Sequence, residues 1–283
     1  MISIIICSRK VDILDELKQN IAETIGCEYE LVIIDNSRNK YNIFQAYNEG
    51  VRRAKGDILC FMHDDILYHS ENWGNKVCEY FDSYPDLGCL GVAGSHLVLD
   101  APASFWHSEA SCLHFYGHDS DGNLLLLDNT ADEVAEDGLI KVCSVDGLWM
   151  SIRKRLFETI CFDDHTFQGF HCYDSDICMQ IIQAGYDIGI AVGVLVEHGK
   201  RGTQNSSYFE SIRAWHKKWT GFLPIVRGAE FSDKDIVART ALVRHIISLE
   251  EQVNSLVKVF ESKSYRFGKA ILRPLKRLRI DSP

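Results

Sequence analysis

No apolar run in this 283-residue sequence is long enough to cross a lipid bilayer. The first residues, Met1 to Cys7, lack the basic region and the cleavage site of a secretory signal, so we expect a cytoplasmic protein. The ten cysteines form no C-x-x-C pair, which argues against a zinc site. Several of them lie within apolar segments, and we interpret them as reduced core residues.

Acidic residues outnumber basic residues outside the C-terminus. The formal net charge is −10, yet residues 263–283 hold seven Lys or Arg and one Asp, net +6, which leaves −16 for residues 1–262. A body this acidic is unsuited to nucleic acid, and we expect no nucleic-acid partner. An apolar content of 46% and a charged content of 25% are typical of a globular protein, here with one main domain and an appendage.

The dinucleotide-binding fingerprint is also absent. The strand predicted over Ile2 to Cys7 is followed by Ser8-Arg9-Lys10 and not by G-x-G-x-x-G, which disfavours a dinucleotide-dependent oxidoreductase. A helix and a second strand, Glu30 to Ile34, complete a βαβ unit whose strands end in polar residues at one sheet edge. Asp35, at the end of the second strand, is placed to bind a ribose or a base, although Asp-Asn-Ser is also an ordinary turn sequence.

The sequence does contain a buried strand that ends in acid. Ile58 to Met62 is continuously apolar, as in a strand covered on both faces of a parallel sheet, and His63-Asp64-Asp65 follows it. Ligands of open α/β sheets bind at the carboxyl ends of the strands. Two adjacent carboxylates repel each other, and a hard cation such as Mg²⁺ or Mn²⁺ relieves that repulsion. A solvated strand end is the alternative interpretation.

Acids and a histidine also mark later element ends. Strands are predicted over Leu87 to Ala93, over Ile140 to Val145 and over Ile188 to Val196, and the last of these leads into Glu197-His198. Tyr173-Asp174-Ser175-Asp176 begins a helix, whose dipole favours acids in the first turn whatever their function. Residues 94–137 show no sustained period, and we predict an aromatic-rich loop and hairpin there.

The order and spacing of these motifs resemble the GT-A fold of nucleotide-sugar glycosyltransferases, specifically the large inverting family 2 of bacterial polysaccharide enzymes. The resemblance covers residues 1 to about 200. It implies an α/β fold with a mostly parallel sheet flanked by helices, here with a C-terminal helical appendage. The matching segments are Ile2 to Ser8, Val32 to Ser37, Asn48-Glu49-Gly50, Ala54 to Asp57, His63 to Asp65, Val145 to Gly147, Tyr173 to Ile177 and Glu197-His198.

The resemblance also implies roles for single residues. Asp35 and Asp64 match acids that contact the nucleotide, and Ser8 and Arg9 join them after the first strand. Asp65 and His198 match the metal ligands, for Mn²⁺ or Mg²⁺, and Asp174 matches the general base. Lys200 and Arg201 lie on a loop suited to closing over the donor's phosphates.

Two positions depart from the family pattern. His63 stands where the family's D-x-D triplet begins, which leaves two carboxylates at this strand end. Tyr173 stands where the family has a glutamate before the base, so the supporting role of that glutamate is missing or has moved. The first of these departures leaves the metal stoichiometry open.

The C-terminal part is predicted to form two further units after a GT-A domain of residues 1–228. Residues 229–262 form an amphipathic helix with a heptad seam, which either pairs with a second chain or docks on the body; we expect a homodimer through Leu242–Phe260. Residues 263–283 mix basic and apolar side chains, which suits an anionic membrane surface, with a solvated tail as the alternative. The seam residues are Leu242, Ile246, Leu249, Val253, Leu256 and Phe260.

The sequence therefore predicts a metal-dependent inverting glycosyltransferase, peripheral on the inner face of the cell membrane. It would move a sugar from a nucleotide-diphosphate sugar to a hydroxyl of a glycan or lipid-linked acceptor in surface polysaccharide assembly. A sugar-phosphate nucleotidylyltransferase is one alternative, but it needs a glycine-rich phosphate loop after the first strand. A non-catalytic GT-A-like interaction module is the other, and it would not need to keep Asp35, Asp64, Asp65, Asp174 and His198 together.

Overall fold

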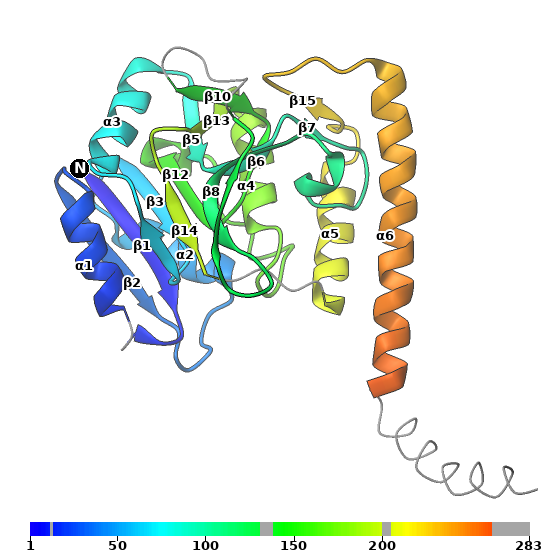
Figure 1. The fold of residues 1–283 in the computed structure, drawn as a ribbon, viewed down its shortest axis with the longest axis horizontal. Coiled ribbons are helices and arrows are strands. Elements are labelled where there is room, and N and C mark those ends of the chain that lie inside the picture. The colour runs from blue at the N-terminus through cyan, green and yellow to red at the C-terminus, as the bar shows by residue number, and fades with distance from the viewer. Residues whose placement is uncertain (12–13, 131–137, 200–204, 262–283) are drawn as a thin grey trace, which may run out of the picture.

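A computed structural model describes residues 1–11, 14–130, 138–199 and 205–261. Its centre is a seven-stranded sheet in which five strands run in one direction and two run in the opposite direction (Figure 1). The two reversed strands are β12 and β10. In order across the sheet the strands are β10 (Leu139–Val142), β13 (Asp187–Ala191), β5 (Leu87–Gly91), β12 (Trp149–Arg153), β3 (Ile58–Met62), β1 (Ile2–Ser8) and β2 (Tyr29–Asp35).

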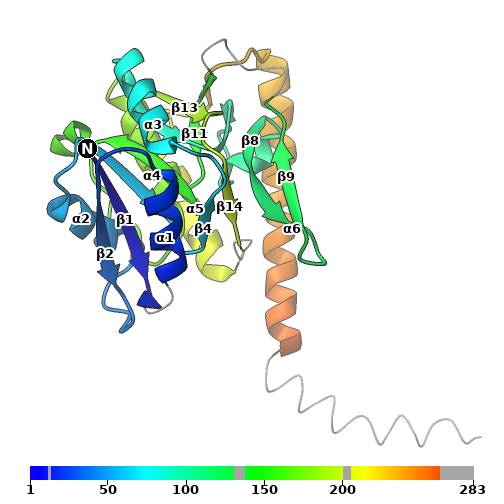
Figure 2. The same cartoon turned by 60° about the vertical axis from the view of Figure 1, so that its left-hand side comes forward.

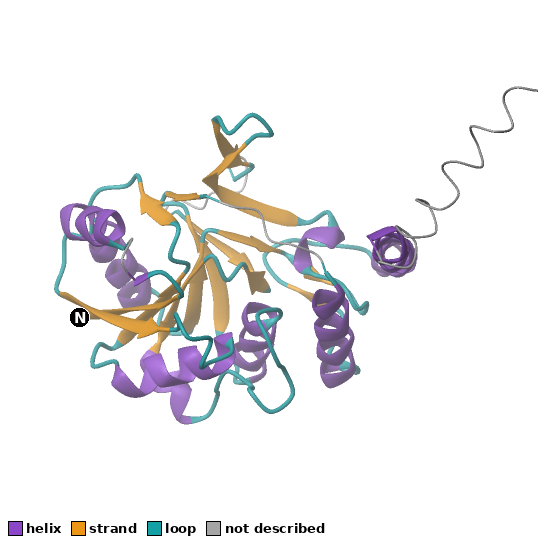
Figure 3. Ribbon diagram, turned by 90° about the horizontal axis from the view of Figure 1, so that it is seen from below, coloured by secondary structure: helices purple, strands orange, loops and turns teal. Residues whose placement is uncertain are grey.

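Each face of this sheet carries its own hydrophobic core. In β1, Ile4 and Ile6 belong to one core and Ile5 belongs to the other, because successive side chains of a strand point to opposite faces. The helices α1 (Asp15–Thr24) and α3 (Trp73–Ser83) cover the first face. The second face is covered by α2 (Ile43–Arg53) and α4 (Tyr173–Gln183), as the end-on view in Figure 3 shows. The predicted α/β class is confirmed.

Close packing explains one motif glycine. Gly50 of α2 faces β1 so closely that a Cβ atom there would overlap the side chain of Ile5. Asn42 begins this helix with a capping box, since its side chain accepts a hydrogen bond from the Gln45 N–H while the Gln45 side chain accepts one from the Asn42 N–H. The segment Asn48-Glu49-Gly50 is thus needed for helix–sheet contact, independently of any ligand.

A second sheet lies beside the first and is shown from another side in Figure 2. Three apolar runs that the sequence predicted as single strands are each divided between the two sheets: β5 leads into β6, β10 into β11 and β13 into β14. Most residues of these runs are buried on both sides of the division, so hydrophobicity alone does not mark it. The strands are β11 (Ser144–Val145), β6 (Ala93–Ser95), β8 (Ser111–His118), β14 (Val196–His198) and β4 (Ile66–Tyr68), with β9 (Leu124–Asp128) paired to β8.

The remaining elements join α5 and α6 to the body. β15 (Ile225–Val226) pairs with β7 (Leu97–Val98), and the short helices η2 and η3 span Phe105–Ser108 and Lys154–Glu158. α5 (Ser206–Trp219) is capped by the Asn205 side chain, which accepts from the Ser207 and Tyr208 N–H groups.

The C-terminal helix α6 (Asp233–Glu261) stands beside α5 and extends past it (Figure 1). Val243 and Ile247 are buried against the body, and Arg244 donates hydrogen bonds to the carbonyl of Asp100 at 2.6 and 3.0 Å. Five of the six seam residues remain exposed, at 46 to 59% of their surface: Leu242, Leu249, Val253, Leu256 and Phe260. The helix therefore docks on the body and leaves much of its predicted seam open.

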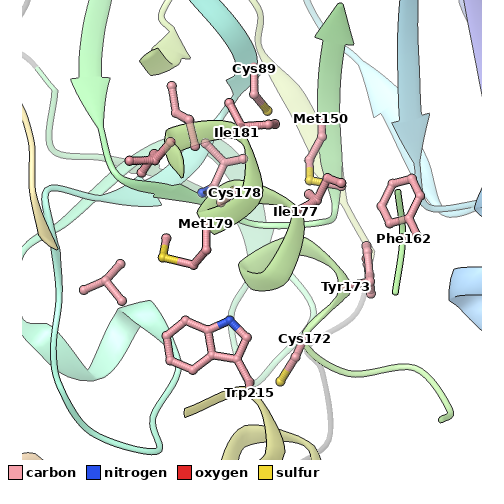
Figure 4. Packing of buried hydrophobic residues seen from close by; sticks show 14 of the residues in the cluster. Cys89, Met150, Phe162, Cys172, Tyr173, Ile177, Cys178, Met179, Ile181 and Trp215 are labelled. Carbon is pink, nitrogen blue, oxygen red and sulfur yellow. Dashed lines mark hydrogen bonds between the residues drawn. The ribbon is translucent and has the colours of Figure 1, made fainter. Parts of the chain in front are cut away.

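Packing around α4 fixes the start of that helix. Figure 4 shows Ile177 beside Met150 and Ile181 beside Cys89, all within one buried cluster. Trp215 of α5 lies near the helix N-terminus and is 2% exposed.

Within the described ranges, no helix is both long and apolar enough to cross a membrane. The residues 263–283 predicted to bind membranes lie outside those ranges.

Candidate active site

Three predicted nucleotide-binding residues lie side by side at the carboxyl edge of the central sheet. Ser8 and Asp35 are partners in the register of β1 and β2. The buried Ser8 hydroxyl donates a hydrogen bond to Oδ2 of Asp64 at 2.6 Å, which ties the end of β1 to the residues after β3. Asp35 is exposed, and hydrogen bonds from Ser37 lower the pKa of its carboxyl group. This edge offers two carboxylates to a ligand, and the buried serine hydroxyl holds one of them in place.

The predicted metal ligands meet because two strands of the second sheet pair. The antiparallel pairing of β4 and β14 sets His198 opposite Ile66, and the Gly199 N–H donates to the carbonyl of Asp65 at 3.3 Å. His198 Nε2 lies 3.5 Å from Oδ1 of Asp65. It also lies 3.1 Å from Nδ1 of His63, a residue that the sequence did not predict as a ligand. One ligand atom from each of these three residues lies within 4.8 Å of the others.

This donor set fits a divalent cation. The three side chains are half-buried, so a cation between them would keep open positions for a substrate. Burial lowers the pKa of His63 to about 3 and, together with the His118 charge, lowers that of His198 against the opposing effect of Asp65. Both imidazoles are consequently neutral near pH 7, which is the form that ligates metals.

The predicted base lies at the start of α4, and the turn before β12 holds it. The Gly147 N–H donates to Oδ2 of Asp174 at 3.0 Å, and the Ser175 N–H donates to Oδ1 at 2.7 Å. Asp146 is close by and accepts from the Leu148 N–H at 2.9 Å. Burial raises the pKa of both carboxyl groups, and the neighbouring Asp174 raises that of Asp146 further, to about 7.

The base and the metal ligands are linked through two contacts. The His63 N–H donates to the carbonyl of Leu148 at 3.0 Å, next to the turn that holds Asp174. His63 Nε2 lies 2.8 Å from the hydroxyl of Tyr173, the residue before Asp174. Asp174 and the three-residue cluster of His63, Asp65 and His198 are therefore connected through Tyr173 and through the turn before β12.

Asp176, two residues beyond Asp174, has a different environment. It is 1% exposed and accepts hydrogen bonds from Trp219 at 2.8 Å and from Gln180 at 2.7 Å. Lys218 forms an ion pair with it at 2.7 Å. These contacts occupy the carboxylate and join α4 to α5, so Asp176 is suited to structure and not to proton transfer.

The structure thus brings six of the predicted site residues to one edge: Ser8, Asp35, Asp64, Asp65, Asp174 and His198. Arg9 follows Ser8 and is exposed, while Lys200 and Arg201 lie outside the described residues. Sequence reasoning did not find the contact of His63 with His198 or the carboxyl pair of Asp146 and Asp174. The Val145-Asp146-Gly147 motif was a signal for the second of these.

Comparison with solved structures gives matches of low similarity. GalNAc-T7, crystallised with UDP, GalNAc and Mn²⁺, matches with a TM-score of 0.47 and 12% identity over 78% of this chain and 49% of that one. This chain therefore spans about half the length of GalNAc-T7. The mannosyltransferase PcManGT from Pyrobaculum calidifontis, in complex with GDP-Man and Mn²⁺, matches with a TM-score of 0.46 and 14% identity over 99% of this chain and 88% of that one. Curated protein sequences give no significant match.

A family model gives the stronger result. The model of a glycosyltransferase-like family matches residues 3–214, which include every predicted site residue. The match confirms the family and the enzyme class that the motifs predicted. The chain belongs to this glycosyltransferase-like family.

Proposed function

We propose that the protein is a metal-dependent inverting glycosyltransferase that uses a nucleotide-diphosphate sugar. The observation that carries the proposal is the connection between Asp174 and the three-residue cluster of His63, Asp65 and His198 at one sheet edge. A transferase needs a base on the acceptor side and a positive charge on the leaving-group side. The contact of Tyr173 with His63 sets the two at adjacent positions.

The donor's nucleotide would lie against the ends of β1 and β2. Asp35 and Asp64 would accept hydrogen bonds from its ribose and base, and Ser8 would hold Asp64 in place. Asp65 and His198 would hold the cation, Mn²⁺ or Mg²⁺, which when bound stabilises negative charge on the diphosphate. Arg9, Lys200 and Arg201 would add positive charge around the phosphates.

The acceptor would react on the opposite face of the donor sugar. Asp174 would take the proton of an acceptor hydroxyl while that oxygen forms a bond to the anomeric carbon. The bond from this carbon to the diphosphate breaks, and its electron pair stays on the phosphate oxygen, so the products are a glycoside and a nucleoside diphosphate. The acceptor would displace the diphosphate in a single step, without a protein nucleophile. The configuration at the anomeric carbon would therefore invert.

The experiment is a screen of nucleotide-diphosphate sugars for nucleoside diphosphate release in the presence of simple glycan acceptors. We expect release with at least one donor, dependent on acceptor and cation, and a product whose anomeric configuration by NMR is opposite to that of the donor. Retained configuration would contradict the single displacement. Pyrophosphate formation from a nucleoside triphosphate and a sugar phosphate would instead indicate a nucleotidylyltransferase.

We further propose that the acceptor is a glycan or a lipid-linked glycan at the inner face of the cell membrane, in surface polysaccharide assembly. The support is the composition of residues 263–283, where seven basic residues are interspersed with apolar ones. The open seam of α6 supports a second association. Since its exposed residues are spaced by four and three, we propose that it pairs with the same helix of a second copy.

A further inference from the structure

The two departures from the GT-A motif pattern are in direct contact. His63 replaces the first acid of the triplet, Tyr173 replaces the glutamate before the base, and the Tyr173 hydroxyl lies 2.8 Å from His63 Nε2. The position of that hydroxyl is closely confined. Tyr173 is 4% exposed, it packs edge-on against Tyr47, and a Cβ atom on Gly147 would overlap its hydroxyl. Contacts with buried neighbours therefore fix the position of the Tyr173 hydroxyl beside His63.

We propose that His63 is a third protein ligand of the metal centre, that Tyr173 fixes its orientation, and that the resulting centre prefers transition ions to Mg²⁺. This inference rests on the proposed function, since it concerns the cation that the function requires. It goes beyond that function because it assigns a ligand and a positioning residue that the motif pattern does not supply, and because it decides between Mn²⁺ and Mg²⁺.

The distances agree with metal ligation. Two adjacent ligand atoms of an octahedral or tetrahedral cation, each about 2.1 Å from it, are about 3 to 3.4 Å apart. His63 Nδ1 and His198 Nε2 are 3.1 Å apart, and His198 Nε2 and Asp65 Oδ1 are 3.5 Å apart. Both distances from His198 Nε2 are therefore nearly those of neighbouring ligands, and the three ligand atoms lie within 4.8 Å of one another.

The hydroxyl of Tyr173 can accept a hydrogen bond from His63 Nε2, and this tautomer leaves Nδ1 of His63 free to ligate. When Nε2 carries the proton and donates it to the Tyr173 hydroxyl, Nδ1 presents a lone pair toward His198. Two imidazole lone pairs that face each other repel unless a proton or a cation lies between them. A cation beside Asp65 satisfies both nitrogens and the carboxylate at once.

Two imidazoles and one carboxylate also restrict the identity of the cation. Mg²⁺ prefers oxygen ligands and retains its water molecules, whereas imidazole suits the later divalent transition ions. Affinity at such a site should rise from Mg²⁺ through Mn²⁺ to Co²⁺. A centre that began with aspartate in place of His63 would discriminate less against Mg²⁺.

The first test counts nitrogen ligands. Pulsed electron paramagnetic resonance of Mn²⁺ bound to the full chain without donor should show two directly coordinated imidazole nitrogens. His63→Gln should show one, and His198→Gln should also show one. If His63→Gln keeps the wild-type nitrogen count and Mn²⁺ affinity, His63 is not a ligand. If neither variant differs from wild type, the cation binds elsewhere and the proposed centre is wrong.

The second test isolates Tyr173. Tyr173→Phe keeps the buried ring and removes only the hydroxyl, so the nitrogen count should stay at two while the Mn²⁺ affinity, measured by calorimetry, falls about tenfold or more. Tyr208→Phe is the matched control, because its hydroxyl bonds to Ser104 at 2.9 Å and not to the metal cluster. Equal Mn²⁺ affinities for Tyr173→Phe, Tyr208→Phe and wild type would overturn the positioning role.

The third test concerns selectivity and separates this inference from the proposed function. Calorimetry should rank wild-type affinities as Mg²⁺ below Mn²⁺ below Co²⁺, and His63→Asp should narrow the ratio of Mn²⁺ to Mg²⁺ affinity at least about tenfold. An unchanged ratio in His63→Asp would contradict the inference. The proposed function would fail in a different way. The protein would then show two nitrogen ligands and the predicted ranking of cation affinities, but it would transfer no sugar from any nucleotide-sugar donor.

Discussion

At the residue scale, the structure separates two aspartates that the sequence places two positions apart. Asp174→Asn keeps the shape of the side chain but removes a proton acceptor, so transfer should fall by about 10² to 10⁴-fold. Affinity for the nucleoside diphosphate and the cation should stay within a factor of two or three, since Asp174 contacts the backbone of Gly147 and not the metal cluster. Rates and calorimetric affinities measured on the same preparation check this prediction.

Asp176→Asn is the comparison for that variant. It weakens the contacts with Lys218 and Trp219, so we expect a lower thermal midpoint and a transfer rate close to wild type once the protein is folded. If Asp176→Asn abolished transfer with donor affinity intact while Asp174→Asn remained active, the base would be Asp176 and the match of Tyr173 to Asp176 with the family motif would shift by two.

The carboxyl pair of Asp146 and Asp174 predicts a pH dependence. Burial raises the pKa of both groups, and that of Asp146 reaches about 7, because two buried carboxylates resist ionising together. Asp174→Asn removes the neighbouring charge that raises the pKa of Asp146, so the pKa of Asp146 should fall below about 7. An NMR titration of the Asp146 carboxyl group in wild type and Asp174→Asn measures the shift, and equal pKa values would contradict it.

The same pair has a stability consequence of defined sign. An aspartate has a pKa of about 4 in the unfolded chain, so between about pH 4 and pH 7 the folded protein binds more protons at Asp146 than the unfolded protein does. This contribution to stability is fully present below about pH 4 and is lost as the pH rises through about 7. As the pH rises from about 4 to above 7, the thermal midpoint of wild type should therefore fall relative to that of Asp146→Asn. A difference between the two midpoints that does not change with pH would contradict repulsion within the carboxyl pair.

Some of this site was accessible from the sequence, and the physical reason is clear. Asp64 and Asp65 follow a strand whose end is visible as the last of five apolar residues, so their placement at the sheet edge needs only strand direction. The contact of His63 with His198 and Tyr173 depends instead on the pairing of β4 with β14 and on the seating of α4. Such long-range packing leaves no local pattern in the sequence.

At the element scale, the long apolar runs were predicted as strands, but their division between two sheets was not, and β12 of the central sheet was missed. The apolar run ending at Ala93 is buried on both sides of the junction between β5 and β6, so its composition is the same in the central sheet and in the second sheet. The short strand β4 was missed for a related reason. Its three residues, Ile66 to Tyr68, carry too little alternation to stand out, although this strand brings His198 to Asp65.

The helix α6 has an inner and an outer apolar face, and substitutions should separate them. Ile247 is 3% exposed, so Ile247→Ala should lower the free energy of unfolding by about 2 to 4 kcal/mol. Val253 and Leu256 are 59% and 56% exposed, so the pair Val253→Lys and Leu256→Lys should leave the thermal midpoint nearly unchanged. Size-exclusion chromatography with light scattering should give the molar mass of a dimer for the wild type and of a monomer for the double variant.

Two results would contradict the predicted dimer through α6. A wild-type protein that is monomeric at high concentration would show that the exposed seam of α6 has no second copy as its partner. A double variant that remains dimeric would place the interface elsewhere on the molecule.

At the scale of the whole molecule, charge divides the chain into an acidic enzyme and a basic end. Truncation before Lys263 removes a net charge of +6 and the apolar residues interspersed with it. Each Lys or Arg near an anionic bilayer contributes about 1 kcal/mol to binding, so the truncated protein should stay active on soluble acceptors but no longer sediment with phosphatidylserine-containing vesicles. Equal sedimentation of the full and truncated chains would dismiss the membrane role.

The central claim is that one sheet edge holds a nucleoside diphosphate through a cation bound at Asp65. Calorimetric titration with UDP, GDP and CDP, with and without Mn²⁺, tests it most directly. The account predicts that at least one of these nucleotides binds the wild type about tenfold or more tightly with Mn²⁺, and that Asp65→Ala loses this dependence because Asp64 and the two histidines cannot replace the missing carboxylate. An equal Mn²⁺ dependence in Asp65→Ala, or no binding of any nucleotide by the wild type, would contradict it.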